Sequence, residues 1–135
     1  NAGMPAYTVG LAVGAAGGDL TGRRVAVLGA SYRGGVKETA FSGVFGAVEA
    51  LTQRGAIAVV HDPLYSDEEL TSLGFTPYHL GEQVDAVVIQ ADHAEYRTLQ
   101  PADLPGITAF IDGRRVSSAD QWPGIAYRVI GKAIA

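Results

Sequence analysis

The sequence predicts an α/β domain with a mostly parallel sheet of about five strands, preceded by an N-terminal helical arm. Two observations predict this class. Five short apolar runs rich in β-branched residues have the length of strands, and they cover 23–29, 56–63, 84–91, 107–113 and 126–131. The segments between the first three runs have helical spacing, so the order is β-α-β-α-β, which produces a parallel sheet with helices on both faces. We therefore predict a single Rossmann-like three-layer domain.

Residues 4–18 are predicted to form the helical arm. Pro5 stands where the first turn of a helix tolerates proline, and Gly17 and Gly18 are the expected end. Gly10 and Gly14 lie inside this segment and lower its helix propensity. We therefore expect this helix to depend on packing against another surface.

Local signals define the other elements. Residues 23–29 are apolar at successive positions, which is typical of a strand covered on both faces. Ser42 is predicted to cap a helix that ends at Gly55, with apolar residues at helical spacing at positions 44, 45, 48 and 51. Ser66 is predicted to cap a shorter helix with acids in its first turn. One or two helical turns are expected at 94–99.

The composition excludes several classes of function. The chain has 135 residues, the size of one domain, and its net charge of −4 argues against nucleic acid or an acidic membrane as partner. It holds no cysteine, which removes disulfides, thiolate metal sites and a cysteine nucleophile. No apolar run approaches the ~20 residues of a membrane span. The first 18 residues do not resemble a signal peptide and lack an initiator Met, so we expect a cytoplasmic chain cut from a longer one.

Candidate binding residues follow the strands. Ligands of parallel α/β sheets sit outside the carboxyl ends of the strands. The polar residues just beyond the first four predicted strands are Ser31, Tyr32 and Arg33, then Asp62, then Asp92 and His93, then Arg114 and Arg115.

The first of these loops reads G-A-S-Y-R-G-G over residues 29–35. Its glycines do not have the G-x-G-x-x-G spacing of a dinucleotide loop, and about thirteen residues separate Gly29 from Ser42. NAD binding by this loop is therefore disfavoured. Tyr32 is suited to packing on a base or sugar, and Arg33 to a bidentate contact with phosphate or carboxylate. The alternative is a solvated loop in which Arg33 pairs with a surface acid.

Two of the other candidates have structural alternatives. Asp62 has the place of an acid that holds a ribose hydroxyl, but an Asp before Pro63 also starts turns. His93 either acts in catalysis or caps the following helical turn together with Asp92.

The remaining charged candidates are two adjacent arginines and three acids on the short helix. Adjacent arginines point in different directions, so at most one of Arg114 and Arg115 faces a given ligand. The acids at 67–69 are interpreted as a solvated helix face rather than a metal site. We predict neither a metal site nor a catalytic residue in this chain.

Five segments, in order along the chain, resemble the C-terminal domain of the UDP-glucose/GDP-mannose dehydrogenase family. NAGMP is similar to N-x-x-M-P, which precedes this domain in the branch that oxidises UDP-N-acetylhexosamines. VAVLGASYRGGVKETAFSG resembles V-x-(V/L)-L-G-x-(A/S)-(F/Y)-K followed by D-x-R-x-S-P, and GAIAVVHDP resembles G-A-x-V-x-x-Y-D-P. VDAVVIQADHAEYRTL resembles A-D-A-(V/L)-(V/I)-x-x-T-x-H-x-x-(F/Y), and FIDGRRV resembles the (V/I)-x-D-x-R strand end.

We predict a UDP-sugar site built from Ser31, Tyr32, Arg33, Asp62 and Arg114, of which the resemblance implies Tyr32, Arg33 and Arg114 and the strand ends supply Ser31 and Asp62. The family's aromatic–Lys pair corresponds to Tyr32 and Arg33, with arginine in place of lysine. Arg114 matches the family arginine that reaches a nucleotide-sugar site, commonly that of the neighbouring subunit. The chain departs from D-x-R-x-S-P at three positions, with Glu38, Ala40 and Gly43 in place of Asp, Arg and Pro.

The resemblance also implies what the chain does not contain. Family enzymes oxidise a sugar C6 alcohol to a carboxylate with NAD, through a thioester on a cysteine of a central domain, and NAD binds a separate N-terminal domain. We therefore expect residues 1–18 to end the central helical region and residues 19–135 to form the nucleotide-sugar-binding domain. Its expected partners are a UDP-sugar and the remaining domains of a homodimeric enzyme. The alternative is a stand-alone α/β regulatory or protein-interaction domain that has lost its ligand.

Overall fold

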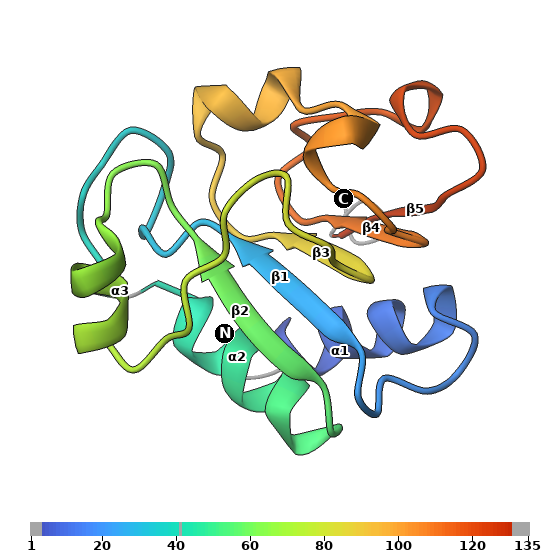
Figure 1. Ribbon diagram of the computed structural model, residues 1–135, viewed down its shortest axis with the longest axis horizontal. Coiled ribbons are helices and arrows are strands. Elements are labelled where there is room, and N and C mark those ends of the chain that lie inside the picture. The colour runs from blue at the N-terminus through green and yellow to red at the C-terminus, as the bar shows by residue number, and fades with distance from the viewer. Residues whose placement is uncertain (1–3, 41, 131–135) are drawn as a thin grey trace.

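The computed structural model describes residues 4–40 and 42–130, and its strands form one sheet (Figure 1). The strands are β1 (Arg24–Leu28), β2 (Ile57–His61), β3 (Ala86–Ile89), β4 (Ala109–Asp112) and β5 (Ala126–Val129). Their order in the sheet is β2-β1-β3-β4-β5, and every pair of neighbours is parallel. The chain adds β2 on one side of β1 and β3 on the other, so the winding reverses between β1 and β3. The predicted Rossmann-like α/β class is confirmed, and the reversal fixes where a ligand is expected.

Two α-helices cover one face of the sheet (Figure 1). α1 (Met4–Ala15) and α2 (Val44–Gln53) pack against each other, α2 also contacts β1 and β2, and α1 contacts β3, β4 and β5. α3 (Asp67–Ser72), beyond the β2 edge, adds Leu70 to the same core. The predicted arm therefore lies on the sheet of its own chain, where Val9 and Ala12 are buried. The division at residue 18 stays a prediction.

The opposite face is covered differently from the expected layer of helices. It carries the short 3-10 helices η1 (Ala94–Thr98), η2 (Pro101–Asp103) and η3 (Ala119–Gln121) and the loops around them. The first of these segments ends at Thr98, because Leu99 already leaves the helical region with φ −61° and ψ 143°. Pro101 keeps Gln100 extended as well, with φ −129° and ψ 162°. Buried aromatic and aliphatic side chains, among them Tyr96, Phe110 and Trp122, fill this second core.

Ser42 and Ser66 are both predicted to cap a helix, but only one of them does so in the structure. Ser66 caps α3 as predicted: its Oγ accepts a hydrogen bond from the Glu69 N–H at 3.1 Å, and the Glu69 carboxylate accepts one from the Ser66 N–H at 2.8 Å. For α2 the predicted cap is wrong by one residue, because Gly43 holds the N-cap position without a side-chain bond. Ser42 bridges the helix and the preceding loop instead, since its Oγ accepts from the Val44 N–H and donates to the Ser31 carbonyl.

No helix in the described ranges is long and apolar enough to cross a membrane.

Candidate functional site

The loop that follows β1 crosses the end of β3 at the reversal of strand order. It begins at Gly29, where φ is +110°. A Cβ at this position would lie 2.5 Å from the Ala91 Cβ and 2.6 Å from the Ala91 nitrogen. Only glycine combines this backbone conformation with so close an approach of two chain segments. The loop therefore starts in direct contact with the strand end across from it.

Ser31 and Asp62, two of the predicted site residues, are buried beneath the loop. One oxygen of Asp62, Oδ2, accepts hydrogen bonds from the N–H groups of Ala30 and Ser31 at 2.8 and 2.9 Å and from the Ser31 hydroxyl at 3.0 Å. The other oxygen accepts from the Leu64 N–H at 2.8 Å, which is the turn-starting bond that the sequence also allowed. Both side chains are bonded inside the protein, so their position suits them to hold the loop rather than to touch a ligand.

His93 is part of the same buried network. Its Nε2 lies 2.9 Å from Asp62 Oδ2, and its Nδ1 accepts a hydrogen bond from the Gly35 N–H at 3.1 Å. Because Nδ1 accepts, the ring proton is on Nε2 and is donated to Asp62. His93 stands at the N-cap position of η1 but forms no capping bond with its side chain, so the predicted cap is wrong. The sequence did not indicate this link between His93 and Asp62.

Asp92 holds the next residue of the loop. Its Oδ1 accepts a hydrogen bond from the Gly34 N–H at 2.7 Å, and this bond lowers the pKa of the Asp92 carboxyl. A Cβ at Gly34 would collide with the Asp92 carbonyl oxygen and would lie 2.7 Å from its Oδ1. Together with the bonds to Asp62 and His93, this occupies the N–H groups of four loop residues. These groups are not available to cradle a pyrophosphate, so the loop does not fit NAD.

Tyr32 and Arg33 are exposed between the residues that hold the loop. The Tyr32 side chain is 46% exposed, while its N–H donates to the Glu38 carbonyl at 2.6 Å. Arg33 is exposed as well, and the ion pairs of the described residues do not include it. The loop thus presents one aromatic ring and one cation to solvent.

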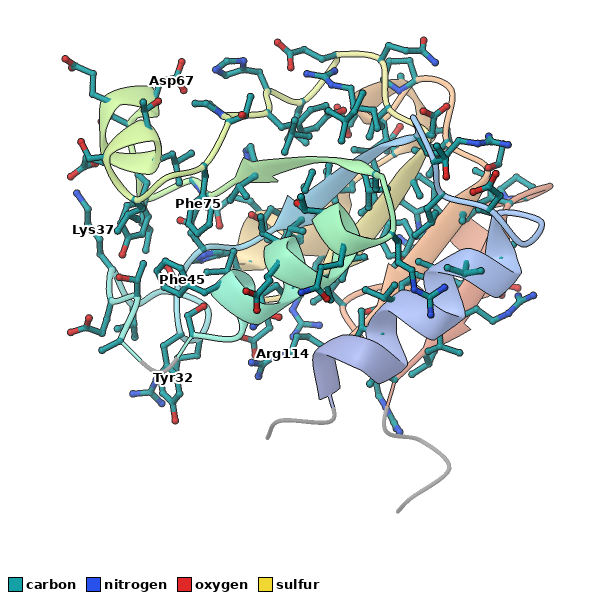
Figure 2. The ribbon with its side chains drawn as sticks, turned by 90° about the horizontal axis from the view of Figure 1, so that it is seen from below. Tyr32, Lys37, Phe45, Asp67, Phe75 and Arg114 are labelled. Atoms are coloured by element: carbon teal, nitrogen blue, oxygen red, sulfur yellow. The ribbon has the colours of Figure 1, made fainter. Side chains whose placement is uncertain are left out.

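Arg114 adds a second cation at the same place. Figure 2 shows Tyr32 and Arg114 at the same side of the molecule, and the Arg114 Nη2 lies 3.5 Å from the Tyr32 carbonyl oxygen. The Nε of Arg114 donates to the Gln90 carbonyl at 3.0 Å, beyond the end of β3. Arg114 is therefore the arginine of the predicted pair that contacts this loop. We call the exposed surface of Tyr32, Arg33 and Arg114 the binding face.

Lys37, the other cation of the loop, is turned away from the binding face (Figure 2). Its Nζ lies 2.6 Å from a Glu69 carboxylate oxygen and 5.3 Å from the centre of the Tyr65 ring. It therefore connects the loop to α3. No three acids or histidines within residues 4–40 and 42–130 are grouped so as to hold a metal ion.

The Asp62 network predicts a specific loss of stability in acid. Burial raises the pKa of Asp62, but hydrogen bonds from His93, Leu64 and Ser31 outweigh burial and lower it to about 2, from 3.8. A lowered pKa in the folded state stabilises the protein above the unfolded value, and that contribution is lost as the pH falls from about 4 to 2. It amounts to about 2 kcal/mol.

Urea unfolding between pH 7 and pH 2 measures this loss, with Asp62→Asn as the reference that cannot titrate at this position. Glu82 also has a pKa lowered to about 2, through its bonds with His79, but it is present in both chains. We expect the wild-type chain to lose about 2 kcal/mol more than the variant across this interval. Parallel pH profiles would contradict the assignment.

Comparison with known proteins shows that the chain is similar to one domain of nucleotide-sugar dehydrogenases. Residues 26–119 match the model of the UDP-glucose/GDP-mannose dehydrogenase family, UDP binding domain. A UDP-glucose 6-dehydrogenase of Rhizobium meliloti (strain 1021) is 30% identical over 92 residues, which are 64% of this chain and 21% of that protein. This range of the family model runs from β1 to η3 and contains every residue of the binding face.

Solved structures of similar proteins share this fold over nearly the whole chain. A UDP-glucose dehydrogenase from Pyrobaculum islandicum has a TM-score of 0.74 at 27% identity, over 93% of this chain and 29% of its own. A UDP-D-ManNAc dehydrogenase from Pyrococcus horikoshii has a TM-score of 0.71 at 25% identity, over 98% of this chain and 32% of its own. The chain thus spans between about a fifth and a third of the lengths of these relatives.

Proposed function

The chain belongs to the UDP-binding domain of the UDP-glucose/GDP-mannose dehydrogenase family, and from this premise we propose that its binding face holds the nucleotide part of a UDP-sugar. The observation that carries the proposal is the exposure of one aromatic ring and two guanidinium groups where the strand order reverses. Each suits one part of the ligand. The Tyr32 ring packs on the planar base or on the sugar, and Arg33 makes a bidentate contact with a phosphate.

Arg114 contributes the second cation to the diphosphate. In this chain its guanidinium already lies against the Tyr32 carbonyl, so no large rearrangement is needed for it to serve a ligand on the same loop. The buried hydrogen bonds under the loop reduce the ordering that binding requires, and preorganisation of this kind raises affinity. We assign Ser31 and Asp62 to this supporting role, as binding-site residues that position the loop.

The oxidation itself is assigned to other parts of a longer enzyme. We propose that the complete protein is an NAD-dependent 6-dehydrogenase that converts a UDP-hexose or UDP-N-acetylhexosamine to the uronic acid. This chain has no cysteine for a thioester, and its β1 loop does not fit a dinucleotide, so the thioester and NAD belong to other domains. In this proposal residues 1–18 end the central helical region, and the enzyme acts as a homodimer.

The proposal predicts selective binding of UDP by residues 1–135. We expect UDP to shift the NMR signals of Tyr32 and Arg33 saturably, while GDP binds more weakly and NAD not at all. Replacing Arg33 or Arg114 with alanine removes a charge-assisted contact with phosphate, which we expect to weaken UDP binding by about ten- to a hundred-fold. Isothermal titration calorimetry measures the dissociation constants.

Arg54→Ala is the matched control for both variants. Arg54 is also exposed, but it lies at the C-cap of α2, whereas the β1 loop leads into the beginning of that helix. This variant is expected to bind UDP like the wild-type chain. If all three substitutions weakened UDP binding equally, the effect would come from the loss of net charge and not from a specific contact. Absence of saturable UDP binding to the wild-type chain would refute the proposal and favour a regulatory or protein-interaction domain.

A further inference from the structure

The two exposed loop residues of the binding face lie between two attachments, one buried and one partly buried. On one side the N–H and hydroxyl groups of Ser31 donate to Asp62, which follows β2. On the other side the N–H groups of Gly34 and Gly35 donate to Asp92 and His93, which follow β3. The directions of Tyr32 and Arg33 therefore depend on both attachments at once.

His93 is the residue that connects the two attachments. Its Nε2 donates to the same Asp62 oxygen that holds Ser31, and its Nδ1 accepts from Gly35. The ring is 1% exposed, and its edge-on contact with Tyr96, at 5.5 Å between centroids, restricts its orientation. Both ring nitrogens are bonded only in the neutral form that carries its proton on Nε2.

Serine, histidine and aspartate meet here, but not in the arrangement of a nucleophile and its base. In that arrangement the imidazole lies between the hydroxyl and the carboxylate. Here the Asp62 carboxylate lies between the other two, since both the Ser31 hydroxyl and the His93 ring donate to Oδ2. The Ser31 side chain is also fully buried. The cluster is thus built to hold the backbone, not to activate the hydroxyl.

We propose that His93 is a positioning residue for nucleotide binding, which keeps Tyr32 and Arg33 in the binding conformation by accepting the Gly35 N–H with a ring that Asp62 orients. This inference rests on the proposed function, because it concerns affinity at the binding face. His93 is buried under the loop and acts only through it. Loss of its acceptor nitrogen is expected to loosen the loop at Gly35 while the fold around it remains.

Two substitutions separate the bonds of the ring. The amide of His93→Gln can reach the place of Nε2 and still donate to Asp62, but it leaves the Gly35 N–H without its acceptor. The amide oxygen of His93→Asn lies near the place of Nδ1 and can still accept from Gly35. We expect UDP affinity to fall about tenfold in His93→Gln and less than threefold in His93→Asn. Amide exchange at Gly35 is expected to accelerate only in the first.

Tyr78→Phe controls for a general loss of stability. It removes the hydroxyl of a buried tyrosine, which donates to the Glu82 carbonyl, and leaves every loop contact in place, so affinity is expected to stay at the wild-type value. Equal UDP affinity in the wild-type chain and both His93 variants would overturn the inference alone. Failure of the wild-type chain to bind UDP would overturn the proposed function, and the inference with it.

A measurement on the wild-type chain keeps the inference testable if a His93 variant does not fold. Nitrogen NMR of the imidazole distinguishes a protonated from an unprotonated ring nitrogen. The Nε2–H form is expected both without and with saturating UDP. A proton on Nδ1 in either state would exclude acceptance from Gly35 and would overturn the inference.

Discussion

Replacing Asp62 with alanine is expected to lower the free energy of unfolding by about 3 to 5 kcal/mol. The substitution leaves four buried donors without their acceptor, namely the N–H groups of Ala30 and Ser31, the Ser31 hydroxyl and the Nε2–H of His93. A buried donor that loses a charged acceptor cannot recover the hydrogen bond from water, because the site is closed to solvent. Urea unfolding at pH 7 measures the loss.

Asp120→Ala is the control for this substitution. Asp120 is exposed, in η3, and its replacement is expected to change the free energy of unfolding by less than about 0.5 kcal/mol. Asp62→Asn should lie between the two, since it keeps the size of the side chain and one accepting oxygen but loses the charge. A loss for Asp62→Ala no larger than that for Asp120→Ala would mean that the loop is held without the carboxylate.

The sheet could be predicted because its signals are local. β1 to β4 are apolar runs with at most one polar or charged residue, at an end, whereas β5 has Arg128 inside it. The capping pattern from Ser66 to Glu69 is contained within four residues of sequence. The layer opposite α1 and α2 was predicted less well. A run such as 94–99 has helical residues but forms only a 3-10 helix that ends at Thr98, and its packing depends on aromatic residues from distant segments.

The binding face was predictable in part for a similar reason. The rule that ligands gather beyond strand ends selects Tyr32, Arg33 and Arg114, all of which are exposed there. It does not distinguish them from Asp62 and Ser31, which also follow strands but are buried. The distinction depends on hydrogen bonds between residues about thirty to sixty positions apart, which no local pattern encodes. The sequence holds one signal for these hydrogen bonds: Gly34 and Gly35 follow β1, and Asp92 and His93 follow the neighbouring strand β3.

Arg114 shows how the resemblance and the structure complement each other. The resemblance implies an arginine directed at a nucleotide-sugar site, commonly in the neighbouring subunit. In this chain the Arg114 guanidinium lies along its own β1 loop. The titration with Arg114→Ala therefore tests a contribution within one chain, and mixing that variant with Arg33→Ala would restore affinity only if the arginine served a partner subunit.

Gly29→Ala is expected to be the most damaging glycine substitution at the reversal of strand order. An alanine there would have to adopt φ +110°, and its Cβ would overlap Ala91, whose nitrogen is part of a rigid backbone. The left-handed conformation costs about 1 to 2 kcal/mol and the overlap about 1 to 3 kcal/mol, so we expect a loss of about 2 to 5 kcal/mol in the free energy of unfolding.

Gly22→Ala separates the two causes of this loss. Gly22 precedes the same strand with φ +73°, but a Cβ there would have no other atom within 4 Å. It should therefore cost only the conformational part, about 1 to 2 kcal/mol. Urea unfolding of both variants isolates the cost of the contact between the ends of β1 and β3. Equal losses would show that the Ala91 backbone yields. A larger loss for Gly29→Ala, together with weaker UDP binding in the folded fraction, would show that this contact sets the position of the binding face.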